Sequence, residues 1–139
     1  MDIVIRSIKF DKTVLPRVAG LYLDTQFADP DSDFSFVEKA FAGSYEVLGA
    51  FDENNLLIGM ARAISDGASD AYIQDVMVAS THRKMGVGKK LVISLTNFLR
   101  TNGIDWIGIV GVPGSEKFYS SCNCQFQEGY SLWFPGEEE

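Results

Sequence analysis

An α+β fold is the fold class that the sequence predicts, and three observations lead to it. Segments in which apolar and polar residues alternate, as in strands, take turns with segments of helical periodicity. Turn-forming residues separate them at short intervals, without repeats or low-complexity stretches. The composition, 46% hydrophobic and 22% charged, is that of a globular protein. At 139 residues, the chain is close to the commonest domain size, so we expect one domain over residues 1–139.

The N-terminal part is expected to form a strand and then a helix. Residues 2–10 alternate as in a strand. Asp11 or Thr13 is the candidate N-cap of the helix that follows. Its apolar face consists of Val14, Val18, Leu21 and Tyr22.

A second, shorter helix is expected after a break at residues 28–32. Asp31 or Ser32 is its candidate N-cap, and Gly43 with Ser44 ends it. Its apolar residues are Phe36, Val37, Ala40 and Phe41.

The middle of the chain predicts three strands. Residues 45–51 and 56–64 alternate as strands, and the polar turn 52–55 between them indicates a hairpin. After a second turn at 66–70, a third strand is expected over residues 71–79.

The C-terminal half predicts a long helix and a final alternation. The helix after Gly86 ends at Asn102-Gly103. A strand over 104–112, a short helix from Ser115 to Cys122, and a last strand or hairpin over 125–134 follow, before a polar tail. The long helix is expected to bury Val87, Leu91, Leu95, Phe98 and Leu99.

The charges are unevenly distributed along the chain. Acidic residues outnumber basic ones by 19 to 12, which gives a net charge of −7. Residues 76–104 nevertheless contain five basic residues and no acidic one, while the rest of the chain carries −12. The five are Arg83, Lys84, Lys89, Lys90 and Arg100. Such an island favours focused binding of a small anion, while the net acidity of the chain argues against nucleic acid as a partner.

Two glycines, Gly86 and Gly88, lie in this basic island between a predicted strand and the long helix. Glycines permit a tight turn that exposes backbone N–H groups, and a helix N-terminus adds unpaired amides and the positive end of its dipole. The order strand, turn, Gly-x-Gly, helix is typical of an anion site, most often for phosphate. A solvated basic helix face is the alternative reading of the charges alone.

Three phosphate-binding motifs compete for these residues. The P-loop pattern G-x-x-x-x-G-K-[ST] fails because Arg83 stands at its first glycine and Lys90 at its Ser/Thr position. The dinucleotide pattern G-x-G-x-x-G fails because Leu91 replaces its third glycine. The pattern [RQ]-x-x-G-x-[GA] fits completely, with Arg83, Gly86 and Gly88.

That pattern is the signature of the GNAT superfamily of acetyl-CoA-dependent N-acyltransferases, which residues 71–126 resemble. The segment 116–124 is similar to the family's F-Y-x-x-x-G-F segment, with Asn123 in place of Gly and Cys124 in place of Phe. Asn is the next-best residue for a left-handed helix cap, so the backbone role is expected to survive. Pro113 stands where many members have an Asn that contacts the cofactor, so that contact is not carried over.

The resemblance implies a GNAT-like fold, with a central mixed, mostly antiparallel, twisted sheet flanked by helices. The strands before and after the signature splay apart in such folds, and acetyl-CoA binds in the gap as cosubstrate. Its pantetheine arm is expected to pair with backbone amides of Val76, Met77 and Val78. Its pyrophosphate is expected on amides of the signature loop. The loop residues are Arg83, Lys84, Met85, Gly86, Val87, Gly88 and Lys89.

The activity implied is acetyl transfer to a primary amine of a small molecule or a protein, by direct attack in a ternary complex. Tyr119 matches the family's tyrosine on the helix after the fifth strand. The resemblance therefore implies that Tyr119 contacts the cofactor and protonates the leaving thiolate. The alternative is that Tyr119 is an aromatic residue of the core or its rim. Asp75 is the candidate to deprotonate the amine through a water or to hold its cation. A structural carboxylate paired with a neighbouring strand is an equal alternative for Asp75. A strand N–H near Met77 or Val78 is expected to stabilise the oxyanion.

The sequence also limits the expected location of the protein and its use of metals. No segment approaches the roughly 20 apolar residues of a membrane span, and residues 1–3 lack the start of a signal peptide. Cys122 and Cys124 are too close in sequence for an easy disulfide and indicate free thiols in a reducing cytoplasm. Two cysteines and one histidine do not make a convincing zinc site, so no metal is expected. We expect a cytoplasmic monomer or homodimer.

Two further functions stay open. A domain of the same fold that binds acyl-CoA as a sensor or partner subunit, without turnover, is the second hypothesis. Nucleotide binding through the glycine loop is the third. Magnesium-dependent binding of ATP or GTP would support the third, and acetyl-CoA binding without turnover would support the second.

Overall fold

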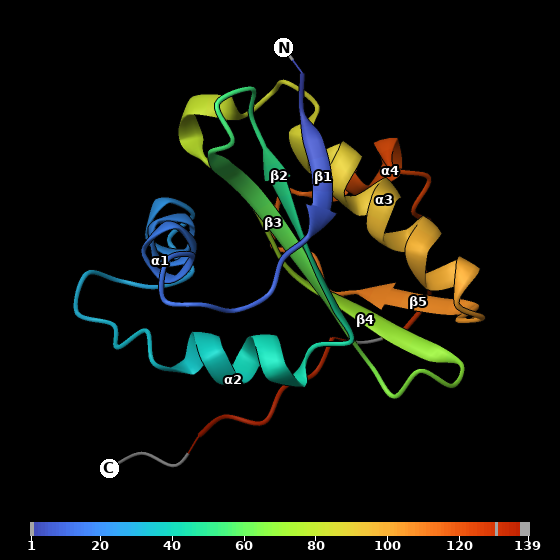
Figure 1. The fold of residues 1–139 in the computed structure, drawn as a ribbon. Helices are drawn as coiled ribbons and strands as arrows, with labels where there is room; N and C mark the ends of the chain where they lie inside the picture. Colours follow the sequence, from blue (N-terminus) through green and yellow to red (C-terminus); the bar gives the residue numbers. More distant parts are fainter. Residues whose placement is uncertain (1, 130, 137–139) are drawn as a thin grey trace.

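The computed structural model describes residues 2–129 and 131–136 (Figure 1). Its elements alternate as the sequence predicts up to the last helix. In chain order they are β1 (Val4–Ser7), α1 (Leu15–Asp24), α2 (Phe36–Gly43), β2 (Glu46–Phe51), β3 (Leu57–Ser65), β4 (Asp70–Val78), a 3-10 turn (Ser80–His82), α3 (Val87–Thr101), β5 (Trp106–Ile109) and α4 (Glu116–Ser121).

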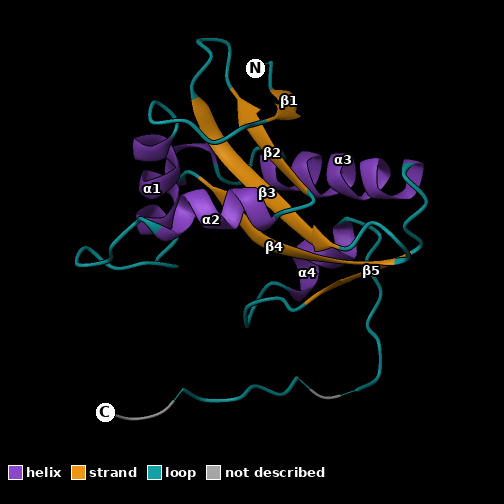
Figure 2. Ribbon diagram, turned by 60° about the horizontal axis from the view of Figure 1, so that its bottom comes forward, coloured by secondary structure: helices purple, strands orange, loops and turns teal. Residues whose placement is uncertain are grey.

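The five strands form one mixed sheet in the order β1-β2-β3-β4-β5. Neighbours from β1 to β4 are antiparallel, and β5 runs parallel to β4. Helices α1 and α2 lie on one face of the sheet, and α3 with α4 lies on the other (Figures 1 and 2). This architecture confirms the predicted fold class.

Two apolar clusters fill the spaces between the sheet and its helices. The cluster on the α3 face includes Leu91, Leu95 and Leu99, each with no exposed surface, and the cluster on the α1 face includes Val18, Met60 and Met77. Replacing one such buried leucine by alanine typically costs 2–5 kcal/mol of the free energy of unfolding. Both clusters therefore hold the sheet in place from opposite sides.

The helix starts differ in detail from the sequence prediction. Asp11 accepts hydrogen bonds from the N–H groups of Thr13 and Val14 in the turn before α1, and the helix itself starts at Leu15. The N-cap position of α2 is Ser35, so the prediction of Asp31 or Ser32 as its cap is wrong. Further hydrogen bonds explain the difference. The side chain of Ser32 bonds back to Asp29 within the preceding loop, and the Oδ1 of Asp33 accepts the N–H of Ser35 at 2.9 Å.

The ends of α3 and α4 have the left-handed residues that the sequence predicts. Gly103 closes α3 with φ 85°, and Asn123 follows α4 with φ 66°. The N–H of Cys124 donates to the carbonyl oxygen of Tyr119 at 3.0 Å, and that of Asn123 to Ser120 at 3.1 Å. This pair of bonds is a Schellman motif, and Asn123 takes the backbone role of the glycine it replaces.

Three strand predictions are corrected. β1 covers four residues rather than 2–10. β5 covers Trp106–Ile109 rather than 104–112. It starts later than predicted because the N–H of Ile104 bonds to Leu99 at the end of α3. The final strand predicted over 125–134 is wrong for the described residues 125–129 and 131–134, which are coil; Tyr130 lies outside the described residues. No described strand runs beside this segment to pair with its backbone, and Figure 2 shows it extending away from the sheet. Its bulky apolar side chains, Phe126, Leu132, Trp133 and Phe134, are 80–98% exposed.

β4 and β5 separate part of the way along β4. Their pairing begins at Asp70↔Trp106 and ends at Ile73↔Ile109, whereas β4 continues to Val78. The residues from Gln74 to Val78 therefore have no partner on β5, which confirms the predicted splay.

A β-bulge lies in the same part of β4. Met60 pairs with Met77 and Arg62 with Gln74, so one residue of β3 faces the two residues Asp75 and Val76 of β4. Asp75 has φ 54°, in the left-handed region that few non-glycine residues adopt. The extra residue changes the phase of the strand. Ala71 and Ile73 belong to the α3 cluster, and the next residues that pack against it are Val76 and Val78 instead of Asp75 and Met77.

Candidate functional site

A cavity of about 1030 Å³ opens where β4 and β5 separate. Its walls come from the splayed part of β4, the loop and first turn of α3, the end of β5, helix α4 and the residues after α1. A volume of this order suits a ligand of the size of a nucleotide cofactor. Among the sequence-predicted site residues, the lining includes Asp75, Val76, Val78, Arg83, Lys84, Gly86, Val87, Gly88, Lys89 and Tyr119.

The glycine loop presents the free N-terminus of α3 to this cavity. Gly86 has φ 83° and Lys84 has φ 62°, so the loop turns twice through the left-handed region. No side chain in the described part of the protein caps the first turn of the helix. Its unpaired amides and the positive end of a 15-residue helix therefore stay available to an anion.

Gly88 allows α4 to pack closely behind the loop. A Cβ built on Gly88 would lie 3.1 Å from two ring atoms of Phe118 and 3.4 Å from Val78. The small residue at this position therefore brings α4, and with it Tyr119, against the start of α3.

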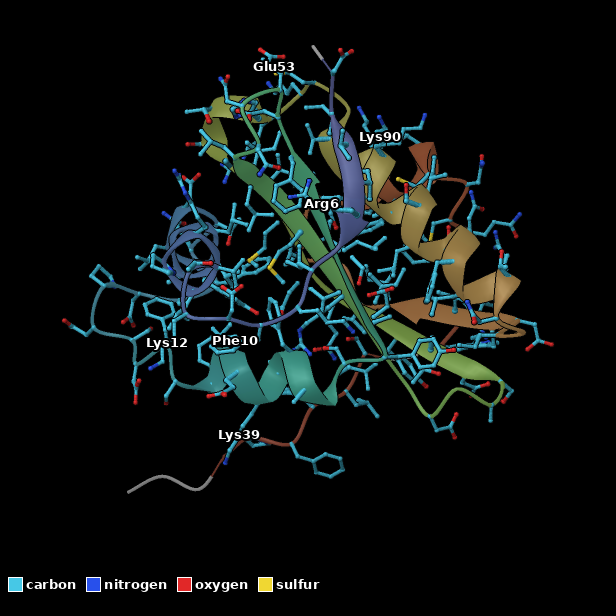
Figure 3. The ribbon with its side chains drawn as sticks, viewed as in Figure 1. Arg6, Phe10, Lys12, Lys39, Glu53 and Lys90 are labelled. Carbon is cyan, nitrogen blue, oxygen red and sulfur yellow. The ribbon has the colours of Figure 1, made fainter. Side chains whose placement is uncertain are left out.

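The lining of the cavity is basic. Arg83, Lys84 and Lys89 contribute to it, and Asp75 is its one acidic member among the described residues. Lys90, the next basic residue of α3, points elsewhere: its Nζ donates to the carbonyl oxygen of Ile3 at 2.7 Å, beside β1 (Figure 3).

The guanidinium of Arg83 donates hydrogen bonds to two backbone carbonyl oxygens of the protein. Its Nε donates to the carbonyl oxygen of Val78 at 3.0 Å, and its Nη2 to that of Asp24 at 3.1 Å. Arg83 therefore ties the start of the glycine loop to the ends of β4 and α1.

Tyr119 lies on α4 with its ring at 4.8 Å from that of Phe118, in an edge-on arrangement. Burial raises the pKa of the Tyr119 phenol to about 12, and the nearby thiols of Cys122 and Cys124 add to the shift. The phenol therefore carries its proton throughout the neutral range. No described residue forms a hydrogen bond with its hydroxyl, so the proton is available to a ligand in the cavity.

The carboxylate of Asp75 is engaged by two side chains. Its Oδ2 accepts a hydrogen bond from Tyr22 Oη at 2.6 Å and forms an ion pair with Arg62 Nε at 2.7 Å. The same guanidinium donates to Ser44 Oγ and to Gln74 Oε1, both at 3.2 Å. The structure thus contains the pairing with a neighbouring strand that was the second expectation for Asp75.

Two predicted residues do not line the cavity. Met77 is fully buried in the α1 cluster, and the side chain of Met85 is 57% exposed on the outside of the loop. Tyr22 and Arg62, which hold Asp75, were not among the predicted site residues. An arginine in the otherwise apolar strand β3 was the available signal, because a charge at such a position requires a partner.

A metal site and a membrane-spanning helix each place requirements on the described residues. No group of three or more His, Cys, Asp or Glu side chains is placed to hold a metal ion in the described part of the chain. Among the same residues, no helix combines the length and the hydrophobicity that crossing a bilayer requires.

Comparison with known proteins bears on this arrangement. The model of the acetyltransferase (GNAT) family matches residues 15–123. GCN5-related N-acetyltransferase 3, chloroplastic, of Arabidopsis thaliana is 28% identical over 98 residues, which are 70% of this chain and 40% of that protein. The uncharacterized N-acetyltransferase ycf52 of Pyropia yezoensis is 35% identical over 68 residues, 49% of this chain and 39% of that protein. The chain spans about two fifths of the length of these two relatives.

Among solved structures, a GNAT family acetyltransferase of Streptococcus pneumoniae superposes with a TM-score of 0.78. The alignment covers 98% of this chain and all of that one at 20% identity. The likeness extends over the whole sheet and the helices on both of its faces.

Proposed function

Because the chain belongs to the GNAT acetyltransferase family, we propose that it transfers an acetyl group from acetyl-CoA to a primary amine, by direct attack in a ternary complex. One observation carries the proposal. A single cavity joins the amides of the glycine loop, the unpaired part of β4 and the phenol of Tyr119. An acyl-transfer site needs these three parts: an anchor for the donor, a backbone against which the thioester lies, and a proton source.

The residues present fit the phosphate end of acetyl-CoA. The uncapped N-terminus of α3 supplies amides from Gly86 onward, and Lys84 and Lys89 supply positive charge at the same wall. Amides and cations together are the groups that bind phosphates in proteins. The edge of β4 that faces away from β3 has no strand partner from Gln74 to Val78, and it suits the amide groups of the pantetheine arm.

The chemistry requires that the amine nitrogen lose two protons, one before and one after attack, and that the sulfur gain one. Acetyl-CoA supplies, when bound, an activated acetyl thioester. The acceptor amine must lose a proton before its nitrogen forms the new C–N bond. As the C–S bond breaks, Tyr119 donates its phenolic proton to the departing sulfur; the nitrogen, now bonded to the acetyl carbon, gives up its second proton, which returns to the Tyr119 oxygen directly or through water. A backbone N–H of Met77 or Val78 is the proposed donor to the carbonyl oxygen during attack. A role for Asp75 as the base stays a prediction.

The acceptor is proposed only as a primary amine, carried by a small molecule or by a protein. The cytoplasmic location also stays a prediction, because one of the relatives compared above is described as chloroplastic.

The first experiment measures the thermal stability of the protein against acetyl-CoA, with ATP as control. A ligand that binds the native state alone adds about 2.7 kcal/mol at a hundredfold excess over Kd. We expect a saturable rise in Tm with acetyl-CoA and none with ATP. The absence of a shift at millimolar acetyl-CoA would contradict the proposal.

Turnover is then followed as thiol release across a panel of amines. Release that requires both an amine and Tyr119 supports the transferase. A thermal shift without thiol release on any amine would favour the second hypothesis, a domain that binds acyl-CoA without turnover.

A further inference from the structure

The hydrogen-bonded cluster of Tyr22, Arg62 and Asp75 lies beside the cavity and joins three elements, α1, β3 and β4. We propose that Tyr22 and Arg62 are positioning residues for the acetyl transfer proposed above: by holding Asp75, they fix the bulged segment Asp75–Val78 against which the thioester is expected to lie. The inference rests on the proposed function, and it assigns Asp75 a role in the backbone geometry of the site rather than in proton removal.

The backbone at Asp75 needs such support. A non-glycine residue with φ 54° lies in a sparsely populated and energetically unfavourable region. Such a conformation persists where its surroundings over-determine it. Here the two side-chain bonds to Oδ2, at 2.6 and 2.7 Å, come from two different elements. They hold the side chain of Asp75 on the α1 face of the sheet.

The consequence for the site is the direction of the next residues. Since Asp75 occupies the α1 face, Val76 and Val78 pack towards the α3 face and line the cavity, while Met77 is buried in the α1 cluster. If Asp75 left its two partners, the bulge would lose its anchor at the point where β4 has no partner on β5. The unpaired amides of this segment would then lose their fixed direction.

Tyr22 is built for this contact and not for packing alone. Its side chain is 4% exposed and its ring lies at 5.2 Å from that of Phe36 of α2. Burial together with the nearby Asp75 carboxylate raises the pKa of Tyr22 above its ordinary value of 10.0, so the hydroxyl remains a donor. A phenylalanine would fill the same volume, and the hydroxyl is therefore explained by the bond to Asp75.

Arg62 extends the cluster to the end of α2. Its Nη1 donates to Ser44 Oγ, and Ser44 in turn donates to the carbonyl oxygen of Ala40 at 2.6 Å. The position of the bulge is thereby linked to both helices on the α1 face. The carboxylate of Asp75 is paired through its Oδ2 with the guanidinium of Arg62, which favours a positioning role.

The test compares Tyr22→Phe with the unaltered protein in three measurements: kcat, the KM for acetyl-CoA, and amide hydrogen exchange of the peptide containing Asp75–Val78. We expect kcat to fall at least tenfold, since a displacement of about 1 Å can cost roughly a hundredfold in rate. The KM for acetyl-CoA and its thermal shift should change several-fold less than kcat, since the phosphate end is bound elsewhere. Exchange of the Asp75–Val78 amides should become faster.

Tyr45→Phe is the matched control. It removes the same hydroxyl from a tyrosine that packs against Phe98 on the other face of the sheet, away from the cavity. It should leave all three measurements unchanged. Arg62→Lys, which keeps the charge but not the planar fork, should give a smaller loss of kcat than Arg62→Met.

Three results would overturn the inference. One is an unchanged kcat in Tyr22→Phe; another is unchanged exchange at Asp75–Val78; the third is a loss of activity in proportion to the loss of folded protein. If acetyl-CoA itself failed to bind the unaltered protein, the proposed function would fall, but the exchange measurement would still show whether Tyr22 holds the bulge.

Discussion

Arg83 and Asp24 connect the glycine loop to the end of α1. The Nη2 of Arg83 donates to the carbonyl oxygen of Asp24 at 3.1 Å, while the carboxylate of the same Asp24 accepts the N–H of Ser80 at 2.6 Å. The last residue of α1 thus holds the connection between β4 and α3 at two places. Because that connection forms one wall of the cavity, these contacts have consequences that can be measured.

Replacing Arg83 by lysine should loosen the loop while keeping its charge. A single ammonium cannot reproduce the fork that reaches both Val78 and Asp24. We expect the free energy of unfolding to fall by about 1 kcal/mol and the KM for acetyl-CoA to rise. Chemical denaturation and steady-state kinetics measure the two effects. Arg100→Lys, in the last turn of α3, is the control; an equal effect of both changes would contradict this account.

Asp24 should make stability depend on pH in the acid range. The hydrogen bond from the N–H of Ser80 lowers the pKa of Asp24 below its ordinary value of 3.8. The folded state therefore binds fewer protons than the unfolded state, and the stabilisation is present above the unfolded-state pKa and lost as the pH falls through the folded-state pKa. The difference in unfolding free energy between the unaltered protein and Asp24→Asn should be larger at pH 7 than in strong acid. The exposed Glu53, changed to Gln, serves as control, and a difference independent of pH would refute the prediction.

Tyr119→Phe should impair chemistry more than binding. Removal of a general acid typically costs 10²–10⁴ in rate, whereas the phosphate end of the ligand is held by the loop. We expect a large loss of kcat with a nearly unchanged thermal shift by acetyl-CoA. Because the pKa of this phenol is about 12, it should produce no alkaline limb below pH 10 in the rate profile of the unaltered enzyme. A variant with full activity would remove Tyr119 from the mechanism.

The left-handed conformation of Lys84 predicts an unusual order of stabilities. Both Lys84→Gly and Lys84→Ala lose the charge, but alanine at φ 62° keeps the steric cost that glycine avoids. We expect the glycine variant to be more stable by about 1 kcal/mol in denaturant titrations. At Lys89, which lies within α3, the order should reverse, because glycine is the poorer helix former. If the glycine variant were the more stable one at both positions, the left-handed φ of Lys84 would not explain the difference in stability.

The features of the fold that depend on local sequence pattern could be predicted. Alternation located the strands, and the glycine spacing located the loop at the start of α3, because both are consequences of short-range geometry. The cluster of Tyr22, Arg62 and Asp75 could not be predicted, since its members are up to 53 residues apart and meet through the packing of α1 on the sheet. The alternative reading of Asp75 as a paired carboxylate came close but did not name the partner.

The largest error concerns residues 125–134, where an apolar pattern predicted a strand. Alternation describes which face of a strand is buried, but a strand exists only where another backbone accepts its hydrogen bonds. In the described part of the chain, β5 forms the edge of the sheet and has no second neighbour. The alternating pattern is therefore not sufficient for a strand, which also needs a neighbouring strand to pair with.

The bulge at Asp75 makes β4 tolerant of changes in side chain but intolerant of changes in length. If one residue were lost there, the half of the strand before it would turn over, bringing Tyr72 and Gln74 to the apolar face of α3 and Ala71 and Ile73 to the open one. Insertions and deletions should therefore be absent from this strand in related sequences that keep the cavity. The site is in this sense encoded by a count of residues as well as by their identity.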